Sequence, residues 1–329
     1  MLAFIQSLPK AELHLHLEGA LPWELVQAHA QEPLPDSPVW WADDFRFDSF
    51  DQFTQSMSFC YRHILTSVES YHLVARQIFH NLAAQNVRYV EISFSPEHAA
   101  SQQLSLSEVA AGIKEAAPET LTVCVFCGLA RTQPHRLSDA LIKEILRTPN
   151  LDGLDLHGHE ALQTPAPFAP IFIQAKEKGL LTKAHAGELA GPQSIKEALH
   201  HLQVARIEHG ATAIQDEDLL ARLAGEGVTL DMCPSSNLKL RVIEDIAMHP
   251  IRQFHERGIR VTVNTDDPTI FGCTLTSELQ LLAEKLCFSA DHLAQLQVNA
   301  FQAAKMPPAK REAVLAEIEG LLARTGNGD

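Results

Sequence analysis

Eight short apolar runs rich in β-branched residues recur along the chain, and segments of helical character separate them. Such runs are typical of parallel strands that are buried on both faces. A chain that alternates strand and helix eight times is expected to close into a (β/α)8 barrel, an α/β fold. The runs comprise residues 9–20, 87–95, 121–130, 151–156, 180–186, 205–209, 228–233 and 259–264.

An open doubly wound sheet is the alternative architecture. That fold requires a glycine-rich first turn, and Gly19-Ala-Leu21 after the first run lacks the G-x-G-x-x-G pattern. No linker divides the chain, so we expect one domain over residues 1–329, with extra helices after the first strand and at the C-terminus. Residues 40–63 are rich in aromatic side chains and could form either a lid or a peripheral helix.

Charge and composition restrict the class of partner. With 41 acidic and 26 basic residues, the 329-residue chain has a formal net charge of −15, which argues against nucleic acid or an anionic membrane as a partner. A small-molecule substrate is therefore expected. No apolar stretch reaches the roughly 18 residues of a membrane span, and six scattered cysteines are typical of a reducing compartment. We expect a cytoplasmic protein.

The first run contains the alternation Glu12-Leu-His-Leu-His-Leu-Glu18. Successive side chains of a strand point to opposite faces, so His14 and His16 share one face. An exposed strand face is one interpretation of this pattern. A metal site is the other, because neutral imidazole is a good ligand for zinc and related ions.

Ionisable residues also follow four of the later runs. Active sites of (β/α)8 barrels lie at the C-terminal ends of the strands, so these residues are expected to meet at one mouth of the barrel. One zinc ion per chain is the first choice for this site, with iron or manganese as alternatives, and a bound water would be activated for hydrolysis. The candidate ligands are His14, His16, His185 and Asp266.

Hydrolysis at such a centre requires a proton donor and a group that orients the water. Glu188 lies three residues after His185 and is the candidate general acid, while His209 and Asp267 are expected to flank the metal. Alone, Glu188 would more simply be a carboxylate near a helix N-terminus. Its position among candidate ligands favours the catalytic role.

Five segments resemble the motifs of the adenosine and adenine deaminases, in the order found in that family. The resemblance extends from residue 8 to residue 268, and it implies a zinc-dependent (β/α)8 enzyme that removes the 6-amino group of a purine. The segments are Leu8-Pro-Lys-Ala-Glu-Leu-His-Leu-His-Leu-Glu-Gly-Ala20, His185-Ala-Gly-Glu188, Arg206-Ile-Glu-His-Gly210, Cys233-Pro-Ser-Ser-Asn237 and Val261-Thr-Val-Asn-Thr-Asp-Asp-Pro268.

The resemblance also implies a role for each matching residue. The four candidate ligands would bind zinc, Glu188 would protonate purine N1, and the Gly158 amide would meet N3. His209 would orient a hydroxide, and Asp267 would hold that hydroxide and meet N7. The hydroxide would attack C6, and ammonia would leave.

Two positions of the sequence resemble different members of the family and therefore indicate different substrates. Adenosine deaminases carry Asp at the position of Glu18, where it reaches the ribose, whereas adenine deaminases carry the longer Glu. Gly158 instead matches the nucleoside enzymes, because adenine deaminases tend to have serine there, and His159 replaces the family's Asp. We expect an adenine nucleoside, adenosine first, with free adenine or an aminodeoxyfutalosine-type nucleoside as alternatives. The expected substrate contacts are His16, Glu18, Gly158 and Asp267.

Three other protein classes compete with this interpretation. A non-catalytic member of the fold would be expected to lack some metal or acid residues, and this chain retains them all. An amidohydrolase with two metals and a bridging lysine could use Lys183, which shares a strand face with His185. The zinc deaminases with a P-C-x-x-C motif are excluded, because the sequence contains none. The sequence predicts no particular oligomeric state.

Overall fold

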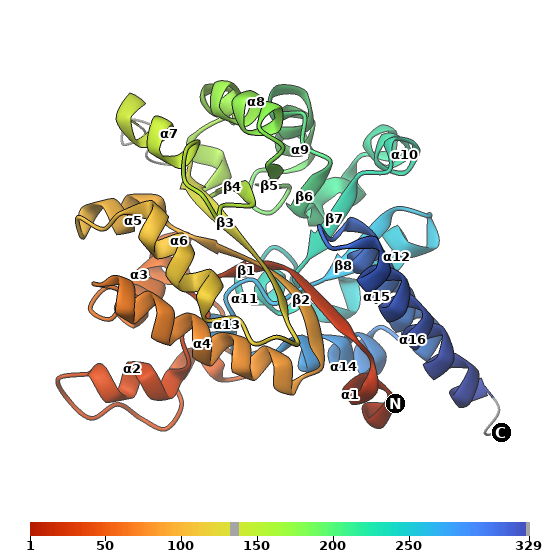
Figure 1. The fold of residues 1–329 in the computed structure, drawn as a ribbon. Coiled ribbons are helices and arrows are strands. Elements are labelled where there is room, and N and C mark those ends of the chain that lie inside the picture. Colours follow the sequence, from red (N-terminus) through yellow and green to blue (C-terminus); the bar gives the residue numbers. More distant parts are fainter. Residues whose placement is uncertain (132–137, 327–329) are drawn as a thin grey trace.

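The structure, a computed structural model, describes residues 1–131 and 138–326. At its centre, eight parallel strands pair in sequence order from β1 to β8 (Figure 1). Each apolar run forms one strand, so the predicted (β/α)8 barrel is confirmed. The strands are β1 (Lys10–His16), β2 (Val87–Phe94), β3 (Thr122–Ala130), β4 (Gly153–His157), β5 (Leu181–Ala186), β6 (Arg206–His209), β7 (Thr229–Met232) and β8 (Arg260–Val263).

The barrel closes where the chain after β8 meets β1. Leu15 and Asp266 form an isolated parallel bridge, and the His16 N–H donates to the Asp266 carbonyl at 3.0 Å. Earlier in β1, a side chain takes the place of a backbone partner, because the Leu13 N–H donates to Asn264 Oδ1 at 2.8 Å. This seam places the candidate ligands of β1 beside the candidate ligand that follows β8.

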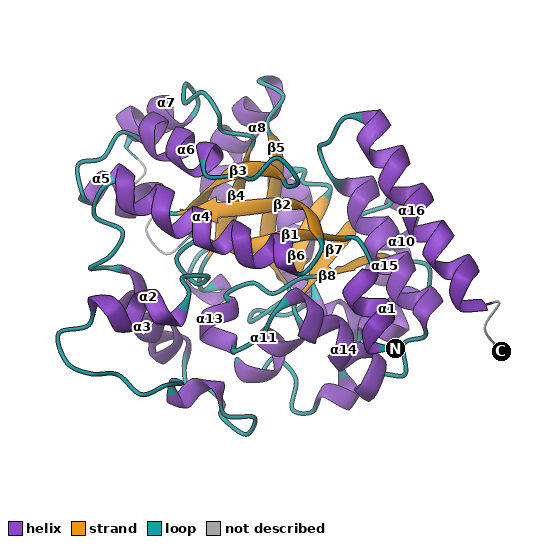
Figure 2. Ribbon diagram, turned by 60° about the horizontal axis from the view of Figure 1, so that its bottom comes forward, coloured by secondary structure: helices purple, strands orange, loops and turns teal. Residues whose placement is uncertain are grey.

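Helices cover the outside of the barrel (Figure 2). Many begin at a Ser, Thr or Asp whose side chain accepts a backbone N–H of the first turn, as Ser67 does for α4 and Asp216 for α10. The helices between or after the strands are α4 (Val68–Ala84), α5 (Pro96–Ser101), α6 (Leu106–Glu115), α7 (Asp139–Ile145), α8 (Ala169–Glu177), α9 (Pro192–Glu197), α10 (Glu217–Glu226), α11 (Pro234–Lys239), α12 (Ile251–Glu256), α13 (Pro268–Phe271) and α14 (Leu275–Lys285).

Additional helices lie outside this alternation, as the sequence predicts. One set comprises α1 (Leu2–Ser7), α2 (Trp23–His29) and α3 (Phe50–Tyr61), and the C-terminal set comprises α15 (Ala290–Ala303) and α16 (Pro308–Gly326). Helix α15 braces the two strands of the seam. Gln297 Oε1 accepts the Ala11 N–H at 2.9 Å, and Asn299 Nδ2 donates to the Val261 carbonyl at 2.9 Å.

Both faces of β1 are buried, from Lys10 to His16. His14 is 0% exposed and His16 is 8% exposed, which rules out an exposed strand face as the cause of the alternating pattern. Burial of polar side chains is costly unless they find partners, so these histidines require an interior polar site.

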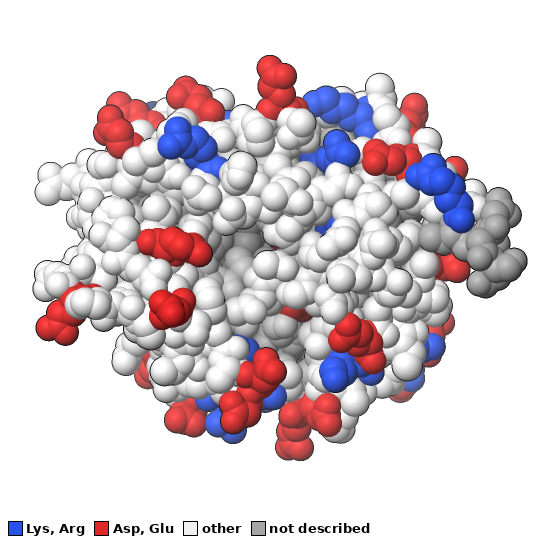
Figure 3. All heavy atoms as spheres, turned by 90° about the horizontal axis from the view of Figure 1, so that it is seen from below, with Lys and Arg blue, Asp and Glu red and all other residues white. Residues whose placement is uncertain are grey.

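On the surface, acidic and basic side chains are interspersed around the periphery of the face in Figure 3. Within the described part of the chain, no helix has the length and apolar character that crossing a bilayer requires.

Candidate active site

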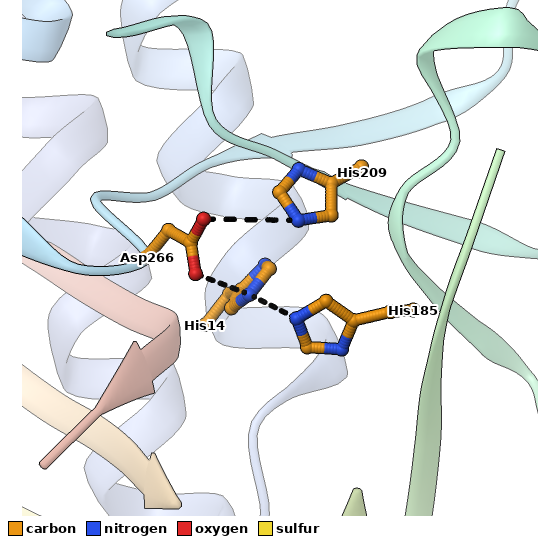
Figure 4. A group of neighbouring side chains, drawn as sticks. All are labelled: His14, His185, His209 and Asp266. Carbon is orange, nitrogen blue, oxygen red and sulfur yellow. Dashed lines mark hydrogen bonds and ion pairs between the residues drawn. The ribbon is translucent and has the colours of Figure 1, made fainter. Parts of the chain in front are cut away.

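The four candidate ligands converge at one mouth of the barrel. His14 and His16 come from β1, His185 comes from β5, and Asp266 follows β8. The Nε2 atoms of His14 and His16 lie 3.1 and 3.2 Å from His185 Nε2, and both lie 3.2 Å from Asp266 Oδ1. Figure 4 shows three of these side chains, together with His209, pointing toward one another.

These distances fit a single divalent ion. Ligand atoms placed about 2.0–2.1 Å from zinc lie about 3.3 Å apart in a tetrahedral site. Two imidazole nitrogens that face each other at 3.1 Å share at most one proton, whereas a cation between them satisfies both lone pairs. Three imidazole nitrogens and one carboxylate oxygen form a donor set that suits zinc.

His209 of β6 faces the same point. With His14, His185 and Asp266 it forms a group whose potential ligand atoms all lie within 4.8 Å of one another. However, His209 Nε2 is 3.8 Å from Asp266 Oδ2, a longer separation than the 3.2 Å between His14 and Asp266. This longer distance favours a place for His209 beside the metal rather than among its ligands.

A chain of hydrogen bonds fixes the proton of His209. The Ile251 N–H donates to His249 Nδ1 at 3.3 Å, so His249 Nε2 carries the proton and donates to Asn237 Oδ1 at 3.1 Å. The Asn237 amide then donates to His209 Nδ1 at 3.1 Å. Burial lowers the pKa of His249 to about 3 and holds the pKa of His209 well below its usual range. His209 is therefore neutral, and its Nε2–H faces Glu188 Oε1 at 3.5 Å.

Two buried carboxyl groups orient His185. Its Nδ1 lies 2.9 Å from Glu208 Oε2 and 3.2 Å from Asp155 Oδ1, which leaves Nε2 for a metal. Lys183 Nζ lies 2.9 Å from the other oxygen of Glu208. Burial would lower the pKa of Lys183, but the charges of Glu208 and Glu91 outweigh burial and raise it. Lys183 is thus a protonated ion-pair partner, which disagrees with the bridging role in the two-metal alternative.

The segment after β7 supplies further contacts that the sequence analysis missed. Ser236 Oγ donates to Asp266 Oδ2 at 2.8 Å, and Cys233 Sγ lies 3.3 Å from His14 Nδ1. The Cys233-Pro-Ser-Ser-Asn237 motif marked this segment without revealing what it touches. His209 and Asp266 also have left-handed φ values of +65° and +64°, a strained conformation that is common at functional sites.

Two more carboxyl groups face this centre. Glu188 is 5% exposed and Asp267 is 3% exposed. Burial raises the pKa of each well above its usual range, and the neighbouring charge of Asp266 raises it further. Both groups therefore favour the protonated form, which can donate a hydrogen bond. Gly19 is required beside Asp267, because a Cβ there would lie 1.7 Å from Asp267 Oδ1.

A cavity of about 290 Å³ opens onto these groups. Helix α3, part of the aromatic segment at residues 40–63, forms one of its walls. All nine predicted site residues lie at this mouth; eight line the cavity, and His14 is fully buried. Their roles stay predictions. The lining comprises His16, Glu18, Phe50, Phe53, Thr54, Met57, Tyr61, Ser93, Phe94, Ser95, Glu97, His98, Ser101, Gly128, Ala130, His157, Gly158, His185, Glu188, His209, Asp266 and Asp267.

Glu18 and Gly158, the two positions that bear on the substrate, both line this cavity. Glu18 is 6% exposed, its Oε1 accepts the Ser95 N–H at 2.8 Å, and burial raises its pKa. Gly158 follows β4 with φ of +96°. Beside it, His157 Nε2 lies 3.0 Å from the Gly128 carbonyl, and burial lowers the pKa of His157 to about 3. His157 therefore forms a neutral part of the wall.

Comparison with known proteins places this site in a family. The family model described as adenosine deaminase matches residues 9–321. The adenine deaminase of Rhodospirillum rubrum is 36% identical over 332 residues, which cover 96% of this chain and 97% of that protein. The adenine deaminase of Sinorhizobium fredii is 35% identical over 322 residues, which cover 94% and 98%. The crystal structure of adenine deaminase from Arthrobacter aurescens has a TM-score of 0.87 and 28% identity, and the match covers 96% of this chain and 99% of that one. The chain therefore belongs to the adenosine deaminase family and is a metal-dependent hydrolase that acts on purine amino groups.

Proposed function

We propose that this protein uses one zinc ion per chain to convert adenine and water into hypoxanthine and ammonia. The observation that carries this proposal is the 36% identity to an adenine deaminase over nearly the whole of both chains. Free adenine thereby replaces adenosine, which the sequence analysis placed first. An adenine nucleoside becomes the second candidate, supported by the match of Gly158 to the nucleoside enzymes.

The position of Glu18 also supports free adenine. Its carboxyl group lies in the cavity wall, and the hydrogen bond from the Ser95 N–H holds it there. By the family resemblance, Asp at this position reaches a ribose. The additional methylene of Glu brings the carboxyl group further into that space. A buried carboxyl group cannot withdraw without losing its hydrogen bond, so a sugar on N9 is disfavoured.

The protonation states in the site suit hydrolysis of an amino group. A zinc ion held by His14, His16, His185 and Asp266 would supply Lewis-acid activation of water near neutral pH. Glu188, whose raised pKa favours the protonated form, would donate to N1 and make C6 more electrophilic. The Nε2–H of His209 would orient the attacking oxygen.

The same assignments balance the reaction. Asp267, whose raised pKa also favours the protonated form, would donate a hydrogen bond to N7 and hold the ring in place. The oxygen of water adds to C6, and the bond from C6 to the amino nitrogen breaks. One hydrogen of the water restores the proton of Glu188, and the other leaves with the amino nitrogen as ammonia. N1 keeps the proton that Glu188 gave.

The proposal is tested by an ultraviolet absorbance assay of the zinc-loaded protein. Adenine, adenosine, deoxyadenosine and an aminodeoxyfutalosine-type nucleoside are supplied in separate reactions. The highest kcat/KM is expected for adenine. A higher value for any nucleoside would overturn the proposal and make Gly158 a better guide to specificity than Glu18. Glu188→Gln, purified in parallel, controls for contaminating deaminases.

A further inference from the structure

Glu160, which takes no part in the reaction scheme, holds the segment that carries Glu188. It lies in the loop after β4 and is 5% exposed. Its Oε1 accepts the N–H groups of Glu188 and Leu189 at 2.8 and 2.9 Å, and its Oε2 accepts the Gly187 N–H at 2.8 Å. Three successive backbone N–H groups therefore converge on one carboxylate.

Two features show that this arrangement is built for an anion. The Ser194 hydroxyl group donates to Glu160 Oε2 as a fourth donor. Gly187 has a left-handed φ of +69°, the type of conformation that turns successive N–H groups toward an anion. A Cβ at Gly187 would also lie 2.4 Å from the Ile195 side chain and would force that side chain to move, so glycine is favoured there. Hydrogen bonds to a charged acceptor are roughly twice as strong as neutral ones, which makes this an effective anchor.

Arg131 holds the start of the same segment. Its side chain is 1% exposed, and Nη2 donates to the His185 carbonyl at 2.5 Å. The His185 imidazole has its own partners in Glu208 and Asp155. The ligand side chain is therefore fixed independently of Glu160, whereas the backbone of Glu188 depends on Glu160.

We propose that Glu160 is a positioning residue that places the Glu188 carboxyl group against purine N1 by holding the backbone of residues 187–189. The inference rests on the proposed function only through the role of Glu188 as the proton donor. Glu160 is not among the described residues that line the cavity, so its replacement is expected to change the position of Glu188 and to leave the rest of the purine pocket intact. An error of about 1 Å in a catalytic group can cost about a hundredfold in rate.

Glu160→Gln preserves the size of the side chain but turns one acceptor into an amide donor that faces backbone N–H groups. We expect kcat to fall about 10- to 100-fold, with KM and zinc content unchanged. Asp152→Asn is the matched control. Asp152 Oδ2 accepts the Val125 N–H at 2.9 Å just before β4 begins, at the opposite end of the barrel. The Asp152→Asn variant should have a lower melting temperature and an unchanged kcat. Ser194→Ala removes one of the four donors to Glu160 and should give a smaller fall in kcat. If Glu160→Gln does not fold, the kcat of Ser194→Ala tests whether this anchor positions Glu188.

A double-mutant cycle separates positioning from general damage. If Glu160 acts through Glu188, adding Glu160→Gln to Glu188→Gln causes no further loss of rate. The proposal is overturned by a loss as large as that in the wild-type background, by a normal kcat in the single variant, or by parallel loss of zinc. Wild-type protein is assayed beside the variants with adenine and adenosine. If the wild-type protein deaminates adenosine but not adenine, the proposed function is overturned. The cycle is then measured with adenosine, so that the role of Glu160 is still tested.

Discussion

The floor and the cover of the cavity are built in different ways. On the floor, ionisable side chains at strand ends are each held by a partner, as Ser236 holds Asp266 and Glu208 holds His185. The cover is helix α3, which presents Phe50, Phe53 and Met57 among other side chains. Fixed charges determine which bond is broken, whereas an apolar cover contributes shape and contact area. Changes on the floor should therefore affect chemistry, and changes in the rest of the wall should affect substrate choice and binding.

The largest effect is expected on the floor, for Asp266→Ala. This change removes one of the four candidate ligands, so zinc content measured by atomic absorption should fall well below one ion per chain. Lewis-acid stabilisation is worth several kcal/mol, so activity should fall by more than about 10³-fold. Unchanged zinc content would contradict the ligand assignment, and two ions in the wild-type protein would restore the two-metal alternative.

The next largest effect is expected for Glu188→Gln. General acid catalysis contributes about 10²- to 10⁴-fold, and kcat should fall within that range while zinc content stays at one ion per chain. In the wild-type protein the protonated form of Glu188 is active, and burial raises the pKa of Glu188 well above its usual range. Activity should thus be lost as pH rises through that pKa. A variant that keeps most of its turnover would remove Glu188 from the mechanism.

A smaller effect, on specificity, is expected for Glu18→Asp. Shortening the side chain by one methylene opens space for a sugar, so kcat/KM for adenosine relative to adenine should rise about tenfold. Glu18→Gln keeps the length and serves as the control, with the ratio between the two substrates unchanged. Equal ratios in wild-type protein and Glu18→Asp would show that another part of the wall excludes the nucleoside.

The smallest effect is expected in the cover, for Met57→Ala. Loss of apolar contact with the purine should raise KM by up to about tenfold, because Met57 is only half-buried and contributes less than the roughly 1.5–3 kcal/mol of a fully buried Met side chain. The value of kcat should stay constant. A fall in kcat comparable to that of Glu188→Gln would show that the cover takes part in the chemistry, and the distinction between floor and cover would then be wrong.

The sequence predicted the side chains of the floor better than the residues that hold them in place. Strand runs and ionisable strand ends are local patterns, and the barrel topology then brings them to one mouth, as it does for His14 and His185. The supports depend on contacts between distant segments: Glu160 lies 28 residues from Glu188, and His249 lies 12 residues from Asn237. Residue type alone does not reveal such pairings.

Substrate choice was harder to predict for a related reason. Glu18 and Gly158 gave opposite indications, because each residue reports only one side of the cavity. Another wall comes from helix α3, which belongs to the aromatic segment that the sequence predicted to be either a lid or a peripheral helix. The shape of the cavity is thus set by many segments that are separate in the sequence, from His16 near the N-terminus to Asp267 after β8.

A competition reaction tests the central claim most directly. Zinc-loaded protein receives adenine and adenosine at equal concentrations in one vessel, and chromatography follows hypoxanthine and inosine over time. Relative rates in such a mixture report the ratio of the two kcat/KM values. We predict that hypoxanthine forms first while adenosine persists. Earlier formation of inosine would contradict the assignment of free adenine as the substrate.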